Sequence, residues 1–246
     1  MFNFFKKKTT FSGIRSLLED HINQLEEKKV SIPSDVFDVT RFAMEEILGT
    51  FESMDTLMEK NDFEGCLKLS RSILENAVNL EYIYKEDTEK RAKNFKLAPI
   101  RKLVEKFETL EEITPEAKEM YDRAVKESKD YVPEKNIREK FKAIGSDRTY
   151  VRSYKRLSEY VHSVYRPGRV DFNELRPYIM EMRRTVLSDT SLVTLMALQD
   201  VCVKYDLDGG IMVIDDLGYK GTIMFATNSK KADEDLNRSL DNKPKK

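Results

Sequence analysis

Two stretches that are otherwise apolar carry polar side chains at the spacing of an α-helix. The first polar stripe is Arg71, Glu75, Asn79 and Tyr82, and the second polar stripe is Tyr154, Ser158, His162 and Tyr165. Both step i, i+4, i+8 and i+11, which places each set on one helix face within about 80° of arc. Buried polar groups are costly unless they bond to one another. We therefore expect the two helices to be neighbours, with Glu75 or Asn79 within about 3 Å of a polar atom of the second stripe.

Few residues in the chain interrupt helices. Nine glycines and seven prolines are low counts for 246 residues, and the remaining composition favours helix. Apolar residues at helical spacing predict helices over 12–28, 36–60, 63–84, 87–110, 115–130, 148–165 and 175–205. The helix over 63–84 is apolar almost all round, which predicts a central position. The expected fold is mainly α, an up-and-down helical bundle.

The composition changes after the central helix and again near the C-terminus. Between Lys85 and Lys142, 30 of 58 residues are charged, which predicts a charged outer helical layer in solvent. Apolar residues at 211–214 and 222–225 flank the segment DDLGYKG and predict a short C-terminal β-hairpin. We expect an N-terminal tail (1–10), a helical domain (11–208), a β-hairpin appendage (209–226) and a disordered polar tail (227–246).

Charge, cysteines and motifs limit the classes of function. The 43 basic and 44 acidic residues nearly cancel, so any nucleic-acid binding has to come from a local patch. Cys66 and Cys202 lie in separate apolar contexts, which predicts core thiols in a reducing compartment and a cytoplasmic location. His21 lies in a stretch that looks exposed. No apolar run approaches the ~20 residues of a spanning helix, so we expect no stable membrane association. The absence of metal and phosphate-loop motifs predicts neither metal nor cofactor.

The segment from residue 148 to residue 169 is strongly basic. Its cations are Arg148, Arg152, Lys155, Arg156, Arg166 and Arg169, against the single acid Glu159, and four tyrosines are interleaved with them. Cations that meet phosphates and rings that stack on bases are what single-stranded RNA binding requires. On a helical wheel Arg152 and Arg156 point away from Tyr154, which predicts a positive outer side. A generic solvated basic face is the alternative interpretation.

The two polar stripes also carry a resemblance. The first stripe, the later run Arg91-Ala-Lys-Asn-Phe95 and the segment from Tyr154 to His162 resemble a bacterial all-helical family of unknown function. That family pairs an R-x3-E-x3-N-x2-Y helix with a later Y-x2-LS-x-YVH helix. The resemblance covers roughly residues 36–205 and singles out these residues, but it brings no assigned activity.

Arg156 and His162 are also similar to the R-x(4–6)-H pattern of HEPN ribonucleases. This resemblance implies a metal-independent cut, with His162 as general acid or base at the ribose 2′-hydroxyl and Arg156 stabilising the phosphorane. It also implies a homodimer, because HEPN sites usually form across two chains. Positions 156 and 162 differ by about 120° around an ideal helix, so Arg156 has to extend sideways or come from the partner chain. Leu157 stands where those enzymes often have a polar residue.

Three functions stay open at this point. The first is an RNA-directed HEPN-like protein, a metal-independent endoribonuclease of a bacterial defence or toxin system, with Arg156 and His162 as catalytic residues. The second is a non-catalytic helical scaffold or regulatory domain with a structural polar network. The third is a small-molecule pocket between the two stripes. The network candidates are Arg71, Glu75, Asn79, Tyr82, Tyr154 and Ser158.

Overall fold

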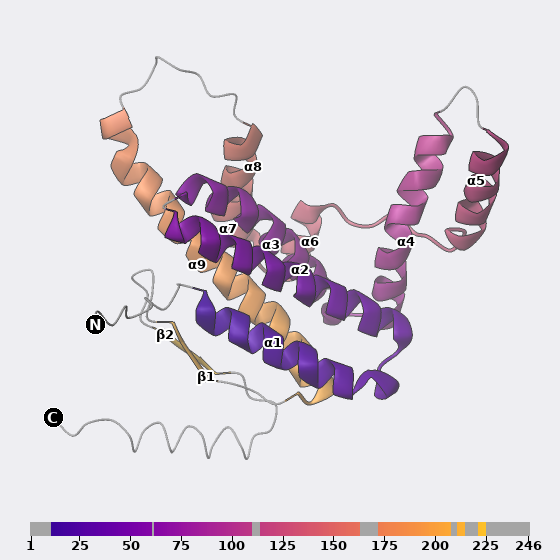
Figure 1. The fold of residues 1–246 in the computed structure, drawn as a ribbon, viewed down its shortest axis with the longest axis horizontal. Helices are drawn as coiled ribbons and strands as arrows, with labels where there is room; N and C mark the ends of the chain where they lie inside the picture. Colours follow the sequence, from indigo (N-terminus) through magenta and orange to yellow (C-terminus); the bar gives the residue numbers. More distant parts are fainter. Residues whose placement is uncertain are drawn as a thin grey trace, which may run out of the picture.

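The protein is mainly helical, as predicted (Figure 1). The computed structural model describes residues 11–60, 62–109, 114–162, 172–207, 211–214 and 221–224. Within this part, the side chains of 12, 63, 159–162, 172–185, 211–214 and 221–224 lie outside the description. The predicted tails over 1–10 and 227–246 also lie outside the described residues. The proposed domain boundaries stay predictions.

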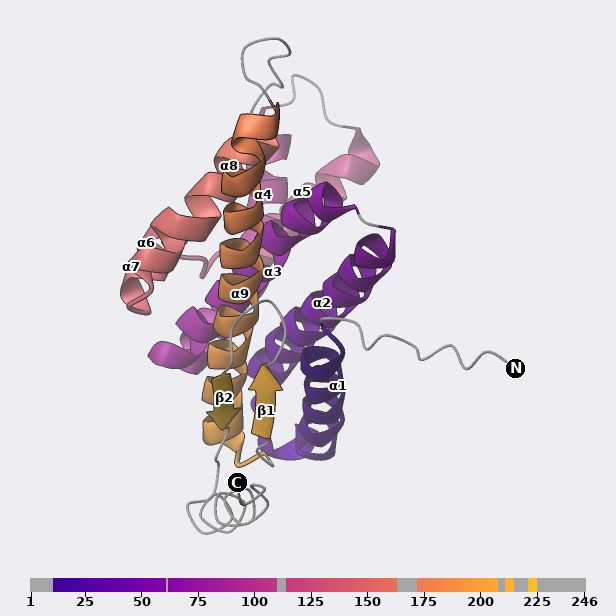
Figure 2. The same cartoon turned by 90° about the vertical axis from the view of Figure 1, so that its left-hand side faces the viewer.

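Two long helices form the centre of the molecule. They are α3 (Phe63–Lys85) and α9 (Phe172–Tyr205), which pack on each other, and α3 also packs on α2 (Ser34–Glu59) (Figures 1 and 2). Asp62 begins α3 by accepting a hydrogen bond from the Gly65 amide at 2.9 Å, a typical N-cap. The central position predicted for α3 is confirmed, because its apolar residues are almost completely buried.

The first helix, α1 (Ser12–Glu27), lies against α2 and is followed by a 3₁₀ turn, η1 (Lys29–Ser31). Its inner side also contacts α9, so the expectation that His21 is exposed was wrong. The imidazole Nε2 of buried His21 lies 3.3 Å from the Cys202 Sγ. Cys66 and Cys202 are both buried thiols, as predicted, and burial raises the pKa of the Cys202 thiol to about 12. Both cysteines are therefore core thiols.

The charged segment forms α4 (Thr88–Phe107) and α5 (Pro115–Glu127), which lie together beside the bundle (Figure 1). The Thr114 hydroxyl caps α5 by accepting from the Ala117 amide at 3.3 Å, and Pro115 occupies the first helical position. Only a narrow line of apolar side chains on these helices is buried, including Ala92, Val104 and Ala124. Most of their other side chains face solvent or are half-buried, as expected for a charged segment.

The helix α6 (Ile137–Ala143) was not predicted. It begins with a capping box, in which the Asn136 and Glu139 side chains each accept from the other residue's backbone amide, at 3.1 and 2.9 Å. Lys140 and Phe141 on this helix are buried. The solvated outer layer predicted for residues 85–142 therefore ends before α6, which packs against α3.

The single helix predicted over 148–165 is divided. It consists of α7 (Asp147–Thr149), a π-helical turn η2 (Tyr150–Tyr154) and α8 (Lys155–His162), and residues 163–165 lie outside the description. Ser153, Tyr154 and Leu157 are buried, whereas Arg152 and Arg156 face outward. The wide turn brings the rings of Tyr150 and Tyr154 into a stack with centroids 5.6 Å apart.

The C-terminal part of α9 is more apolar than we expected from the sequence. Among the described residues, Val186–Tyr205 is long and apolar enough to cross a membrane by length and composition, although no such run was expected. Two thirds of that window (67%) is buried inside the protein, as in a core helix. After α9, strands β1 (Ile211–Ile214) and β2 (Gly221–Met224) pair antiparallel, with Ile211 opposite Met224. Residues 215–220 lie outside the described residues, so the hairpin appendage stays a prediction.

Candidate functional site

The two polar stripes meet at a compact group that we call the Glu75 cluster, formed by Arg71, Glu75 and Tyr154. The Tyr154 hydroxyl donates to Glu75 Oε1 at 2.5 Å, and Arg71 Nε donates to the same oxygen at 2.9 Å. The Arg71 guanidinium carbon also lies 5.4 Å from the centre of the Tyr154 ring. These contacts confirm the prediction that the stripes are neighbours.

Burial explains the ionisation of the cluster. Desolvation of the phenol, together with its hydrogen bond to Glu75, raises the pKa of Tyr154 to about 12. Tyr154 therefore stays protonated at neutral pH and donates to the carboxylate. Its ring is held by Phe141 on α6 and by Tyr150, with centroids 5.5 and 5.6 Å away. One carboxylate oxygen thus receives two donors in a packed aromatic setting, which is the arrangement of a structural network.

A second satisfied group lies next to the cluster, at the contact between η2 and α9. Asp189 is only 1% exposed and accepts from Arg152 Nε at 2.9 Å. The Arg152 Nη2 and the Ser153 hydroxyl also donate to this carboxylate. A buried carboxylate requires such partners. Arg152 was predicted as an RNA-binding cation, and in the structure its guanidinium is engaged with Asp189.

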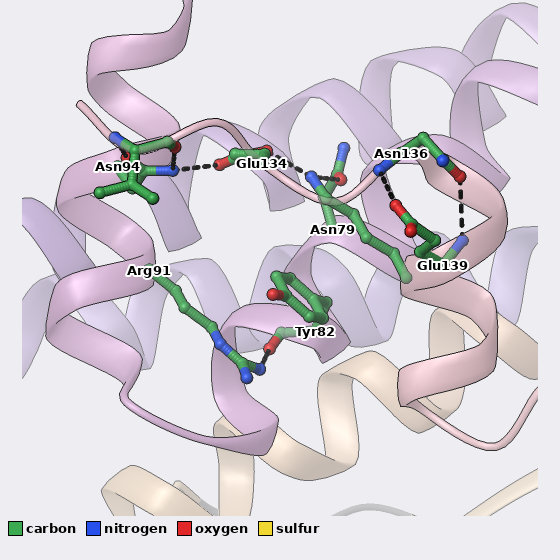
Figure 3. Close-up of polar contacts among 9 residues, drawn as sticks. Asn79, Tyr82, Arg91, Asn94, Glu134, Asn136 and Glu139 are labelled. Atoms are coloured by element: carbon green, nitrogen blue, oxygen red, sulfur yellow. Dashed lines mark hydrogen bonds and ion pairs between the residues drawn. The ribbon is translucent and has the colours of Figure 1, made fainter.

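The other half of the first stripe has different surroundings (Figure 3). Asn79 Oδ1 accepts from Lys140 Nζ at 2.9 Å, and Lys140 also pairs with Glu134. The Lys140 side chain is only 7% exposed, so this ammonium is buried between an amide and a carboxylate. Lys140 also lies 5.5 Å from the centre of the Tyr82 ring.

Two more cations lie over the Tyr82 ring, Lys135 with its Nζ 5.7 Å from the ring centre and Arg91. The Arg91 guanidinium carbon lies 4.0 Å from the ring centre, close enough for a cation–π contact. Arg91 also donates to the Tyr82 backbone carbonyl (Figure 3) and, through Nη2, to Glu86 at 2.9 Å. These bonds join the end of α3 to the start of α4.

Asn94 attaches the segment before α6 to α4. Its side-chain amide donates to the Val132 carbonyl at 2.8 Å and accepts from the Val132 amide at 2.8 Å. The side-chain amide thus bonds both backbone groups of Val132, as a neighbouring strand does in a β-sheet. These two bonds fix the direction of residues 131–135. The same amide nitrogen lies 3.5 Å from Glu134 Oε1 (Figure 3).

The end of α3, the start of α4 and the segment 130–135 line a cleft of about 410 Å³, which we call the Tyr82 cleft. Its walls are Tyr82 at the end of α3, the side chains between Asp87 and Leu97 at the start of α4, and residues 130–135. The volume falls in the range of small-molecule sites, about 300–1,000 Å³. A small-molecule pocket was predicted between the two stripes. The observed cleft lies beside Tyr82 of the first stripe, two helical turns from Glu75 along α3.

The remaining predicted residues lie on or near α8. Arg148, Lys155 and Arg156 are exposed, and Ser158 is half-buried. The His162 backbone is the last residue of α8, while its side chain lies outside the description. Tyr165, Arg166 and Arg169 are also outside the described residues. Within the part of the chain that the structure describes, no group of three or more His, Cys, Asp or Glu side chains is suited to a metal ion.

Sequence reasoning missed the side chains that complete the Tyr82 cleft. Arg91 and Asn94 belong to a run already singled out by the family resemblance, but they were given no role. Glu134 and Lys140 lie in a charged segment, where nothing local distinguishes a buried lysine from an exposed one. Asp189 had a clearer signal, because it interrupts the apolar sequence of α9.

Comparisons with known proteins identify a family and leave the chemistry open. The family described as "Family of unknown function (DUF5677)" matches residues 38–174, which span both polar stripes. No curated protein and no solved structure matches the chain.

Proposed function

The chain belongs to this family of unknown function, and from that premise we propose that it is an RNA-directed cytoplasmic protein that binds single-stranded RNA along α7, η2 and α8. We further propose that it cleaves the bound strand without a metal ion, as a homodimer of HEPN-like modules in bacterial defence. Arg156 and His162 are the proposed catalytic residues.

The observation that carries the proposal is the exposure of the basic side chains on these helices. Arg148, Lys155 and Arg156 are exposed, whereas Tyr154 and Leu157 are buried against the bundle. The inner side therefore holds the segment in place while the outer side offers cations to phosphates. Tyr150 is half-buried and lies at the base of this surface, with the Arg138 guanidinium 6.0 Å from its ring centre.

The catalytic part of the proposal rests on Arg156 and on the position of His162 at the end of α8. The two residues are six positions apart, about 9 Å along the helix axis. With the two positions that far apart along one helix, Arg156 joins His162 at one phosphate most readily when the partner chain supplies it. This geometry favours a site that needs two copies of the protein.

RNA binding is tested by titrating a fluorescent, unstructured 20-nucleotide RNA at several salt concentrations. We expect affinity to fall steeply as salt rises, and the salt dependence to weaken in an Arg148→Ala/Arg156→Ala variant. Lys118→Ala/Lys126→Ala is the matched control, because both lysines are exposed on α5. No binding at low salt, or equal loss in the control, would exclude the RNA proposal.

Cleavage is tested with the single variants Arg156→Ala and His162→Ala. Both should lose RNA cleavage while their melting temperatures stay close to that of the natural protein, since Arg156 is exposed. A destabilised His162→Ala variant beside an unchanged Arg156→Ala variant would favour the second candidate, a helical scaffold. The Glu75 cluster favours that candidate too, because its hydrogen bonds are made within the protein.

A further inference from the structure

We propose that the Tyr82 cleft binds a phosphate ester of about the size of a nucleoside monophosphate. This inference goes beyond RNA binding along α7 to α8 and does not depend on it, because the cleft is built from α3, α4 and the segment 130–135. Charge, rigidity and shape each support it.

Two of the three acidic side chains that line the cleft are already paired with lysines of the protein. Asp130 pairs with Lys93 at 3.1 Å, and this ammonium lowers the pKa of Asp130. Glu134 pairs with the buried Lys140. An incoming anion therefore meets little repulsion from either carboxylate, because each is already matched by a cation.

Two cations are left to receive an anion. Among the described residues, neither Lys90 nor Lys135 has an acidic partner, although both line the cleft. The Tyr82 hydroxyl likewise has no hydrogen-bond partner within that part of the chain. Two ammonium groups and a phenol hydroxyl are suitable donors for the oxygens of a phosphate.

The walls that carry these groups are fixed. Asn94 holds Val132 with two 2.8 Å bonds, and Arg91 holds the end of α3 against the start of α4 (Figure 3). Buried Lys140 supports Tyr82 from the side of α6. Binding to a site that is already formed costs little ordering entropy.

The remaining lining favours a ligand with an organic part and a modest charge. Leu97, Val132 and Pro133 give the cleft an apolar wall suited to a flat ring. Asp87 has no cationic partner among the described residues, so it opposes ligands with several negative charges. A monophosphate with one ring system satisfies both conditions in about 410 Å³.

The test titrates 5′-AMP and, separately, adenosine into the full-length protein by isothermal titration calorimetry at low salt. We expect 5′-AMP to bind more tightly than adenosine, and Lys90→Ala/Lys135→Ala to weaken 5′-AMP by about tenfold or more. Asp87→Asn should tighten 5′-AMP by a factor of about two to five. Lys118→Ala/Lys126→Ala is the control and should bind 5′-AMP like the natural protein.

A second arm separates a free nucleotide from the end of an RNA. It compares a short oligoadenylate with and without a 5′-phosphate. A gain from the phosphate that disappears in Lys90→Ala/Lys135→Ala supports the site with an RNA terminus as its ligand. The inference is overturned if the phosphate raises the affinity of neither adenosine nor the oligoadenylate. It is also overturned if that gain in affinity remains in Lys90→Ala/Lys135→Ala. Arg148→Ala/Arg156→Ala should leave 5′-AMP binding unchanged, so failure of the RNA proposal is distinguishable from failure of this one.

Discussion

The two halves of one polar stripe on α3 have opposite surroundings. In the Glu75 cluster a single carboxylate oxygen receives both Tyr154 and Arg71. In the Tyr82 cleft, cations are in excess on the walls, and Lys90 and Lys135 lack acidic partners among the described residues. The same helical spacing therefore produces a satisfied hydrogen-bonded group at one end and, at the other, the cleft that we propose binds a ligand. The difference lies in which segments pack opposite: η2 supplies a donor to Glu75, whereas α4 and residues 130–135 leave a space beside Tyr82.

The largest effect on stability is expected beside the cleft, where buried Lys140 bonds Asn79 and Glu134. Lys140→Ala removes the buried ammonium and leaves Asn79 Oδ1 and the Glu134 carboxylate without their donor. Breaking such a buried pair should lower the free energy of unfolding by about 2–4 kcal/mol in urea denaturation. Lys142→Ala, on the same helix but exposed, should change it by less than about 0.5 kcal/mol. Equal effects of the two substitutions would show that Lys140 is not buried as described.

Glu81 sharpens the comparison, because it lies six residues from Glu75 and lacks its donors. It is 4% exposed, and its Oε2 has no hydrogen-bond partner among the described residues. Burial, with a smaller contribution from Asp200 against the opposing Lys85, raises the pKa of Glu81 from 4.5 to about 7. The folded protein thus holds a proton that the unfolded chain releases above about pH 4.5.

The raised pKa of Glu81 therefore stabilises the fold fully at acidic pH, and the stabilisation is lost as pH rises through about 7. The free energy of unfolding should fall by about 1–3 kcal/mol between pH 5 and pH 8, and Glu81→Gln should flatten this slope. Burial also raises the pKa of Asp200, which acts in the same direction. A Glu81→Gln variant with an unchanged slope would assign the pH dependence to another group.

The Glu75 cluster should respond less strongly, because Arg71 and Glu75 are 28% and 40% exposed. Glu75→Ala leaves the Tyr154 hydroxyl and the Arg71 guanidinium without their acceptor and should cost about 1–2 kcal/mol of stability. Tyr154→Phe should cost about 1 kcal/mol. In a double-mutant cycle the two changes should couple by about 0.5–1.5 kcal/mol. Additive effects would mean that the hydrogen bond contributes nothing to stability.

Local pattern was sufficient for the long helices and for the meeting of the stripes. Periodic apolar residues located α3 and α9, and the cost of burying Glu75 predicted a polar partner on the helix of Tyr154. The short helix α6 was missed because seven residues contain too few turns to show a period, although Asn136 and Glu139 form a capping box. The π-helical turn was missed because it depends on how Tyr150 and Tyr154 stack against Phe141.

The Tyr82 cleft was beyond sequence reasoning for a different reason. It depends on contacts between segments far apart in the chain, such as Asn94 with Val132 and Asn79 with Lys140. Asn94 and Lys140 are polar and lie near other polar residues, so the sequence does not indicate which of them is buried. Arg91 and Asn94 stood out only through the family resemblance, which supplied no role for them.

The most direct test of the division along α3 measures unfolding and 5′-AMP binding on the same two variants. Tyr154→Phe should lose about 1 kcal/mol of stability and keep its affinity for 5′-AMP. Lys90→Ala/Lys135→Ala should keep its stability within about 0.5 kcal/mol and lose about tenfold or more in affinity. The reverse pattern, or the loss of both properties in both variants, would contradict the account that one stripe serves structure at Glu75 and ligand binding at Tyr82.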